Sequence, residues 1–466
     1  LYLIMTKSAE KLYMSYAVKN SEGAALMPSY IIRSMRKMFS HCLKLSYKDT
    51  AQQNSYVTIP RAANSFDNTE IAANVDEDII DSLTGGRLVG SVTSFENFAE
   101  CPLRYYLRYG VDLKEREEFT FSPVNFGVVL HAVIREVCDE IKKNGESYYL
   151  ISEEKRREMV KRSVAAITDI YQNSILKDSS RNSFMIKRME DLADRTVWAM
   201  GEQLKCGDFV PFVFEHKFNM EVGDGDRKQL MSGTIDRVDI CENGTDVYVR
   251  IIDYKTGKKD FNIVKTYYGI DIQLMVYMEA AMKLVAKMRP GKNVIPAGVF
   301  YYNISDPIVS ATTESAEEIE DKIKGELRLK GMVNSDKDIA EKMDNNEGTS
   351  LNIPVSRKAD GGFDSRRSKV MNTEQFNMLG RFVDVRAVDT ADRIAGGDIR
   401  RSPYKDGQFS SCDRCPYGAV CGFSVDLPGC NYRKLKKFDD EVLWNNIKEG
   451  VDENGKKMDT GAEERD

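Results

Sequence analysis

Three short stretches between residues 233 and 277 decide how the fold is interpreted: Gly233-Thr-Ile-Asp-Arg-Val-Asp239, Arg250-Ile-Ile-Asp-Tyr-Lys-Thr-Gly257 and Gln273-Leu-Met-Val-Tyr277. Successive side chains of a strand point to opposite faces, and the alternation in residues 230–240 and 247–255 predicts two strands. The dipeptide Asn243-Gly244 between them is a strong signal for the turn of an antiparallel hairpin. The third stretch is predicted to lie in a helix over residues 269–288.

The two predicted strands each end in a carboxylate, Asp236 and Asp253, and Lys255 follows two residues after the second. Carboxylate oxygens are hard ligands that suit Mg²⁺ or Mn²⁺, which often keep water and phosphate as further ligands. A lysine beside such an ion orients a water molecule and offsets the charge that builds on a phosphate. The pattern therefore indicates metal-assisted phosphodiester hydrolysis. A lone Asp-x-Lys is more often a surface ion pair, so the interpretation depends on the neighbouring motifs.

Together these motifs resemble the PD-(D/E)XK nuclease superfamily, specifically its RecB-like branch. The resemblance is carried by Asp236, by Asp253-Tyr254-Lys255 and by Gln273 with Tyr277. It implies an α/β fold with a restriction-endonuclease-like core, in which a mixed central sheet is flanked by helices. It also implies that the Tyr254 carbonyl helps to hold the metal, and that Gln273 and Tyr277 hold DNA or the catalytic lysine. Two polar residues on a half-exposed helix remain the competing interpretation of that last pair.

Two further site residues are expected upstream of the hairpin. Residues 125–143 are predicted to form an amphipathic helix, and His131 lies beside its apolar stripe, one turn after Gly127. A single histidine in such a place is usually structural, but Gly-x-x-x-His resembles the RecB-like pattern, in which this histidine is a metal ligand. Residues 212–218 are predicted to form a strand with Phe212, Phe214, His216 and Phe218 on one side. The family implies a supporting role for Glu215, on the other side.

Composition excludes several classes of protein. The chain has 466 residues and a formal net charge of −6, which argues against an overall basic coat but allows a local basic channel for nucleic acid. No apolar run reaches the roughly 18 residues of a membrane span, and no secretory signal is visible. The 9 cysteines are therefore expected to lie in a reducing, cytoplasmic compartment, where a cysteine cluster binds a metal more often than it forms disulfides.

Such a cluster occurs near the C-terminus as Cys412-x2-Cys415-x5-Cys421. Three thiolates at this spacing indicate Zn²⁺ or an iron–sulfur cluster, which calls for a fourth soft ligand. Cys430 is nearer in sequence, but Cys101, in Cys-Pro-Leu-Arg-Tyr-Tyr before the nuclease motifs, is the better candidate. One cysteine upstream and three downstream resemble the [4Fe–4S] staple of AddB-type nucleases. Such a clip would close a very long loop of the chain.

The helix predicted after Ser91, whose side chain is expected to cap it, has two open interpretations. Its Arg104, Tyr105, Arg108 and Tyr109 interleave charge and aromatic rings, as in segments that contact a nucleic-acid strand. They fit equally well as core aromatics with arginines that extend to the surface.

The N-terminal region resembles the last motif of a superfamily 1 helicase. Thr6 is a plausible helix cap, and Lys7 stands where that family has an arginine at the ATP phosphates. Lysine does not replace arginine in that role, and the chain has no phosphate-binding Gly-x-x-x-x-Gly-Lys-Ser/Thr loop, so we expect this fragment not to bind ATP. The start without methionine predicts a fragment of a longer protein.

We therefore expect four regions: residues 1–70 as a helicase remnant, 71–90 as a linker, 91–430 as the nuclease domain closed by the staple, and 431–466 as a charged tail. Within them, residues 334–368 are expected to be partly disordered, and the tail is expected to be mobile from about Gly450.

Taken as a whole, the chain resembles the C-terminal part of the AddB family. The resemblance implies a DNA exonuclease subunit that processes double-strand-break ends for recombinational repair, cuts single strands from duplex ends, and pairs with an AddA-type subunit in an ATP-dependent helicase–nuclease. One alternative is a stand-alone RecB-like iron–sulfur exonuclease of the CRISPR-associated type. Another is a DNA-binding structural module with a vestigial nuclease site.

Overall fold

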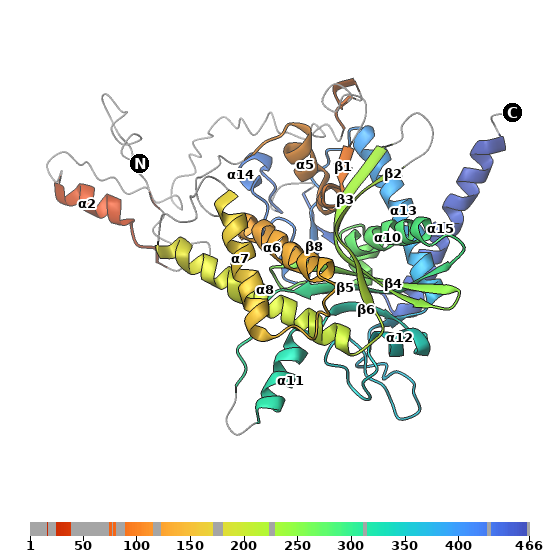
Figure 1. Cartoon of the computed structure of the whole chain (residues 1–466). Helices are drawn as coiled ribbons and strands as arrows, with labels where there is room; N and C mark the ends of the chain where they lie inside the picture. The colour runs from red at the N-terminus through yellow and green to blue at the C-terminus, as the bar shows by residue number, and fades with distance from the viewer. Residues whose placement is uncertain are drawn as a thin grey trace. The chain divides into compact units, whose positions relative to one another are not determined.

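The computed structural model describes residues 16, 25–38, 74–76, 78–80, 89–114, 123–170, 180–222, 229–310, 315–425 and 430–463 (Figure 1). The chain divides into two compact units, residues 1–69 and 70–466. In the first unit the structure describes one helix, α2 (Tyr30–Met38). Thr6 and Lys7 lie outside the described residues, so the helicase-like interpretation of this region stays a prediction.

The second unit is built on a seven-stranded mixed sheet in the order β1-β3-β4-β5-β6-β7, with β2 also paired to β3. The pairs β2–β3, β3–β4 and β5–β6 are antiparallel, whereas β1–β3, β4–β5 and β6–β7 are parallel. The strands are β1 (Val89–Ser91), β2 (Val210–Val222), β3 (Gln229–Asn243), β4 (Asp246–Lys255), β5 (Asn293–Asn303), β6 (Lys330–Asn334) and β7 (Val370–Met371). The predicted mixed α/β core is confirmed.

The predicted hairpin is present, with one correction. Asn243 pairs with Asp246, and Gly244 takes φ +60° at the corner, a backbone conformation that glycine adopts readily. Asp236, however, does not end β3. It lies where the pairing of β3 with β4 stops, because the first paired residue is Arg237, opposite Ile252. The strand continues back to Gln229, where β1 and β2 are its neighbours.

Helices cover both faces of the sheet (Figure 1). On one face pack α6 (Pro123–Lys143), α7 (Glu153–Ile170) and α8 (Ser180–Lys205), and on the other α4 (Val92–Glu100), α10 (Gln273–Met288), α13 (Thr373–Ala395) and α15 (Asp440–Glu463). The apolar stripe of α6 is buried as predicted, at Phe126, Val129, Leu130, Val133, Ile134, Val137 and Ile141. In the described part of the chain, no helix is long and apolar enough to cross a membrane.

Smaller elements complete the unit. The short helices are α5 (Pro102–Tyr105), the π-helix η2 (Tyr106–Gly110), α9 (Ile263–Tyr267), α11 (Ala316–Glu326), α12 (Lys337–Met343) and α14 (Gly418–Cys421). A second, three-stranded sheet has the order β10-β8-β9, from β10 (Arg433–Lys434), β8 (Tyr404–Asp406) and β9 (Phe409–Ser410).

Alternation along β4 decides which side carries the chemistry. Ile252 and Tyr254 pack into the core under α6–α8, whereas Val249 and Ile251 pack under α10 and α13. Asp253 and Lys255 continue the second set, so they point toward α10.

Helix starts and breaks differ from expectation in two places. The helix capped by Ser91, whose hydroxyl accepts a hydrogen bond from the Ser94 amide, stops at Glu100 because Cys101 is extended (φ −166°). The chain then restarts with Pro102 at the first helical position, where a missing N–H costs nothing. The helix expected from Gly269 begins only at Gln273.

The disorder expected for residues 334–368 is wrong. This segment contains α12, and Ile353 and Val355 are fully buried in the core under α6–α8. Its polar residues bind each other and the backbone: Arg357, for example, donates to the carbonyl of Ala340 at 2.8 Å.

The charged tail begins with β10 and becomes helical at Asp440, where α15 starts. Leu443 and Ile447 of α15 are buried in the core under α10 and α13. The helix continues past Gly450 to Glu463, and the mobility expected from about Gly450 stays a prediction.

Candidate active site

Three metal-ligating side chains from different elements meet at one side of the sheet. His131 comes from α6, Glu215 from β2 and Asp236 from β3, and their ligand atoms all lie within 4.8 Å of one another. His131 Nδ1 is 3.4 Å from Asp236 Oδ1 and 3.9 Å from Glu215 Oε1. An imidazole and two carboxylates form a mixed donor set that suits a divalent cation.

A local irregularity in β2 aims Glu215 at this cluster. Glu215 has φ +47°, which costs free energy for a residue with a Cβ and is found mainly at functional sites. The aromatic side chains of β2 divide between the two faces: Phe214 packs with the core under α6–α8, whereas Phe212 and Phe218 pack with the core under α10 and α13. The prediction that Phe214 and Phe218 share one side of the strand is therefore wrong.

Asp236 is held by the backbone of the neighbouring strand. The amide of Tyr254 donates a hydrogen bond of 2.6 Å to Asp236 Oδ2, which leaves Oδ1 facing His131. The Tyr254 side chain lies with the core under α6–α8, and its ring meets the His131 ring edge-on, 5.9 Å between centroids. The role expected for the Tyr254 carbonyl stays a prediction.

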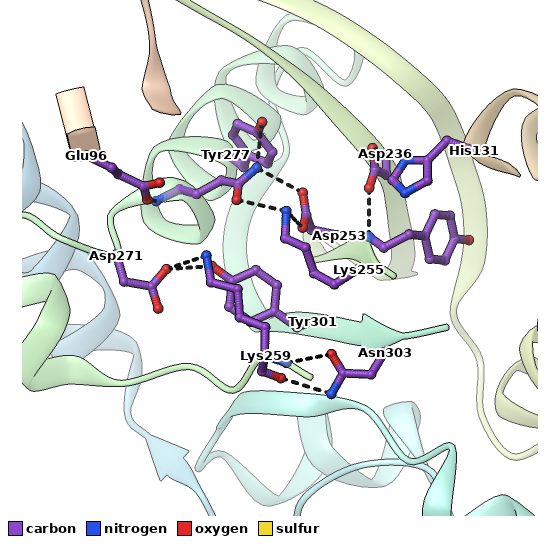
Figure 2. A network of polar contacts seen from close by, with 12 residues as sticks. Glu96, His131, Asp236, Asp253, Lys255, Lys259, Asp271, Tyr277, Tyr301 and Asn303 are labelled. Carbon is purple, nitrogen blue, oxygen red and sulfur yellow. Dashed lines mark hydrogen bonds and ion pairs between the residues drawn. The ribbon is translucent and has the colours of Figure 1, made fainter. Parts of the chain in front are cut away.

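Asp253 and Lys255 are joined by the two polar residues of α10, as Figure 2 shows. Lys255 forms an ion pair with Asp253 and donates to Gln273 Oε1 at 3.0 Å. The amide nitrogen of Gln273 lies 3.1 Å from Asp253 Oδ1 and 2.9 Å from the Tyr277 hydroxyl. Gln273 is 8% exposed and Tyr277 5%, so both are buried rather than half-exposed. They therefore fix the lysine and the aspartate relative to each other.

Burial and the charge of Asp236 make two carboxyl groups of this site, those of Asp253 and Glu215, hard to ionise. Burial, followed by the charge of Asp236, raises the pKa of Asp253 to about 6 and also raises the pKa of Glu215. Burial alone would lower the pKa of His131, but the hydrogen bond and charge of Asp236 outweigh it and raise that pKa. A dication here would offset the crowded negative charge, so the donor set fits Mg²⁺ or Mn²⁺ on electrostatic grounds.

Glu96 of α4 is a site residue that sequence reasoning missed. Its Oε1 accepts hydrogen bonds from the amides of Ile272 (2.9 Å) and Gln273 (3.0 Å), at the N-terminus of α10. The residue that precedes α10, Ile272, offers no side-chain cap, so a carboxylate more than 170 positions earlier supplies it. Burial raises the pKa of Glu96 to about 7. The missing local cap at Ile272 was the signal that a partner was needed.

A second polar group extends this network away from the metal ligands (Figure 2). Asp271 accepts a hydrogen bond of 2.6 Å from the Tyr301 hydroxyl. It also forms an ion pair of 3.0 Å with Lys259. Asn303 binds both the amide and the carbonyl of Lys259, each at 3.0 Å. The segment that follows β4 is therefore tied to β5 beside Lys255.

The four cysteines predicted to bind a cluster line one pocket: Cys101, Cys412, Cys415 and Cys421. Cys430 is buried but does not line this pocket. Burial raises the pKa of Cys101, and the nearby Cys415 adds to the shift. The hydroxyl of Tyr417 donates to the Leu113 carbonyl at 2.8 Å, which binds the C-terminal cysteine loop to the segment after Cys101. Four thiols converging from both ends of the domain are a donor set that fits an iron–sulfur cluster.

The segment after Cys101 has two interpretations, contact with nucleic acid and packing in the core, and its residues differ in which one they fit. Tyr105 is 8% exposed and packs edge-on against Phe98, so it is a core aromatic. Arg104 forms an ion pair with Glu100 one turn earlier. Tyr109 is 38% exposed, with the Arg108 guanidinium 5.4 Å from its ring centroid.

Comparison with known proteins gives a consistent result. Residues 90–422 match the sequence pattern of the PD-(D/E)XK nuclease superfamily. The chain is also similar to proteins named as the B subunit of an ATP-dependent helicase/deoxyribonuclease. It is 31% identical to the one from Caldanaerobacter subterraneus subsp. tengcongensis, over 100% of this chain and 45% of the relative. It is 30% identical to the one from Clostridium acetobutylicum, over 97% of this chain and 44% of the relative. It is also 30% identical to the one from Lachnoclostridium phytofermentans, over 100% of this chain and 44% of the relative. The chain thus spans less than half the length of these relatives.

Proposed function

The chain belongs to the PD-(D/E)XK nuclease superfamily, and we propose that its nuclease domain hydrolyses phosphodiester bonds of DNA with Mg²⁺ or Mn²⁺. The observation that carries this proposal is the meeting of His131, Glu215 and Asp236 beside the Asp253–Lys255 pair. A dication bound there would polarise the phosphate and stabilise the leaving oxygen. The comparisons do not favour the stand-alone CRISPR-associated exonuclease.

We assign each residue of the site a role from its position. His131 and Asp236, with Asp253 and the Tyr254 carbonyl, would hold the metal, and Glu215 would support them from β2. Lys255, held by Gln273, orients the attacking water and faces the charge that builds on the phosphate oxygens. Tyr277 holds Gln273 in turn, so the lysine is kept in one geometry before substrate arrives.

The relatives' names, which describe the B subunit of a helicase/deoxyribonuclease, support a further proposal about the partner and the biological setting. The chain acts as the nuclease part of an ATP-dependent helicase–nuclease that processes DNA ends for recombinational repair in the cytoplasm. In this proposal an AddA-type subunit supplies ATP-driven unwinding and delivers single strands to the nuclease domain. The similarity extends over the whole chain to proteins of that name, which supports this proposal.

A [4Fe–4S] cluster closes the nuclease domain in the same proposal. Its ligands are Cys101 and the three cysteines of the C-terminal loop, which line one pocket. The group would act as a clip between segments more than 300 residues apart and takes no part in hydrolysis.

Replacing Asp253 with alanine tests the active site. We expect Asp253→Ala to reduce Mg²⁺-dependent cleavage of labelled single-stranded DNA by at least about a thousandfold, because the catalytic groups act as a unit. Lys255→Ala should behave alike, and both should bind DNA nearly as well as the unmodified protein. Asp260→Ala, an exposed aspartate in the turn after β4, is the matched control. Substantial cleavage by purified Asp253→Ala protein would refute the assignment, and binding without cleavage by the unmodified protein would favour a vestigial site.

A further inference from the structure

An arginine-lined pocket lies beside the active-site network and has no part in the chemistry described above. Four arginines and one aspartate line it, with Phe98, Ala99, Pro102, Tyr268 and Gly269 among the other lining residues. The arginines come from three segments: Arg386 and Arg393 from α13, Arg400 from the chain after it, and Arg433 from β10. The aspartate is Asp389.

The positive charge of this pocket is only partly neutralised. Asp398 pairs with Arg393 at 2.9 Å and with Arg400 at 2.6 Å. Arg433 donates to backbone carbonyls, including that of Ser402 at 3.0 Å. Counting the four arginines against Asp389 and Asp398 leaves a formal excess of two positive charges.

Arg386 is the arginine of the pocket that is preformed for a ligand. Its guanidinium lies 5.2 Å from the Phe382 ring centroid and 5.5 Å from that of Tyr267, which holds the planar group in place. Its Nε is buried and has no hydrogen-bond partner within the described part of the chain. A buried donor without a partner is costly, so this guanidinium gains more from an anion bound in the pocket than a fully paired one would.

The position of the pocket relates it to the substrate strand. Ala99 lines the pocket, and Glu96, three residues earlier on α4, caps Gln273 of the catalytic network. Three residues rise about 4.5 Å along a helix. Tyr268 and Gly269 line the pocket just before α10 begins. These contacts place the pocket close to the N-terminus of α10, whose Gln273 binds Lys255.

We propose that this pocket binds a backbone phosphate of the single DNA strand that is being cut, next to the scissile position. The ligand is a phosphodiester because a planar guanidinium donates to two phosphate oxygens at once, and because basic and aromatic groups together are typical of single-strand binding. The proposal rests on the proposed function, since it takes DNA as the substrate.

The salt dependence of DNA binding tests this proposal. Binding of a fluorescent single-stranded oligonucleotide is measured by anisotropy without divalent metal, so that no cleavage occurs. We expect Arg386→Gln to weaken binding about tenfold and to reduce the slope of log K against log salt by about 0.7, the value for one lost phosphate contact. Arg386→Lys keeps the charge and should retain most of the slope. Arg381→Gln, an exposed arginine on the same helix that does not line the pocket, should leave both quantities unchanged.

A purely structural role of Arg386 would give a different pattern. In that case Arg386→Gln and Arg386→Lys would both lower the melting temperature. The folded fraction of each variant would bind DNA with the same salt slope as the unmodified protein. This result would overturn the proposal. A second variant, Arg400→Gln, whose side chain is 56% exposed, should reduce the slope without a large loss of stability.

Hydrolysis of bis(p-nitrophenyl) phosphate separates this proposal from the proposed function. That substrate has no neighbouring phosphate, so Arg386→Gln should hydrolyse it at the rate of the unmodified protein. Suppose that the unmodified protein shows no cleavage, while Arg386→Gln still reduces the salt slope of oligonucleotide binding. The phosphate site then stands and the nuclease assignment fails. If cleavage is intact and the slope is unchanged, the phosphate site fails alone. Competition by inorganic phosphate or a mononucleotide, with no change in oligonucleotide slope, would assign the pocket to a free phosphate and overturn the strand proposal.

Discussion

Glu96 shows how a single residue outside the motif can control the motif. It caps α10 by binding the amides of Ile272 and Gln273, and Gln273 in turn binds both Asp253 and Lys255. The negative carboxylate also suits the positive end of the α10 dipole. Removing it should shift the glutamine and, through it, the lysine, without touching substrate.

We therefore expect Glu96→Ala to lower kcat on single-stranded DNA by roughly ten- to a hundredfold with little change in KM, because small displacements of a catalytic group are costly. Glu96→Gln retains an acceptor oxygen and should recover much of the activity. Ser315→Ala, which removes the cap of the distant helix α11, serves as the control, since it loses a cap of similar energy. A fall in stability alone, equal in Glu96→Ala and Ser315→Ala, would show that Glu96 does not position the site.

Glu215 adopts a backbone conformation that favours glycine, and we expect Glu215→Gly to stabilise the fold by about 1 kcal/mol while it lowers cleavage. Glu215→Ala removes the same carboxylate but keeps the strain, so it should lose activity without the gain in stability. Urea unfolding midpoints at constant m-value measure both effects. If the glycine variant is no more stable than the alanine variant, the strain assigned to Glu215 is absent.

At the scale of elements, two acidic residues meet between helices on one face of the sheet. Asp384 of α13 lies against Glu279 of α10, and burial, together with the hydrogen bond and charge of Glu279, raises the pKa of Asp384 to about 8. The unfolded-state pKa is near 3.8, so the folded protein holds an extra proton between these values. This contact therefore contributes stability at low pH, and the contribution is lost as pH rises toward 8.

Asp384→Asn should remove this pH dependence. We expect the variant to melt a few degrees above the unmodified protein at pH 8.5, where two carboxylates would otherwise repel each other, and to differ little at pH 5. Thermal melts across that range provide the measurement. Glu279→Gln should show the same trend from the other helix, and a melting difference that does not vary with pH would contradict the raised pKa of Asp384.

A buried charge cluster has a structural role beneath the active site. Asp239 is 0% exposed and pairs with Arg237 at 2.6 Å and Arg250 at 2.9 Å. The two arginines offset the burial of Asp239 and lower its pKa. This second aspartate of the Gly233–Asp239 stretch therefore belongs to the junction of β3 and β4 and not to the metal site, although it stands only three positions from Asp236.

At the scale of the whole molecule, the cysteine pocket joins α4 to the C-terminal loop. Cys101 follows α4 directly, so the helix that carries Glu96 also ends at the cysteine pocket. A cluster bound to all four cysteines would fix the end of α4. Closing so long a loop restricts the unfolded chain more than a local contact does.

The iron content of purified protein tests this staple. We expect about four irons and matching sulfide per chain, with broad visible absorption, when the protein is prepared without oxygen. Cys415→Ser should lose most of the iron and unfold at lower temperature, whereas Cys430→Ser, a buried cysteine outside the pocket, should keep it. One zinc per chain and no visible absorption would replace the iron–sulfur assignment with a zinc site.

The sequence by itself determined the elements whose information is local. Side-chain alternation marked the β3–β4 hairpin, the apolar stripe marked α6, and the short motifs placed Asp253, Lys255 and Gln273 on neighbouring elements. These features depend on residues a few positions apart, for which the geometry of strands and helices is nearly constant. The hairpin, α6 and the nuclease family were therefore predictable.

Only the tertiary structure decided which distant residues meet. Residues far apart in sequence are brought together by the path of the chain, which no local period encodes: Glu96 reaches α10, and Tyr417 reaches Leu113. The left-handed conformation of Glu215 is likewise imposed by its surroundings, against its own preference. The polar segment 334–368 was misjudged for the same reason, because its order comes from long-range burial of Ile353 and Val355 rather than from its composition.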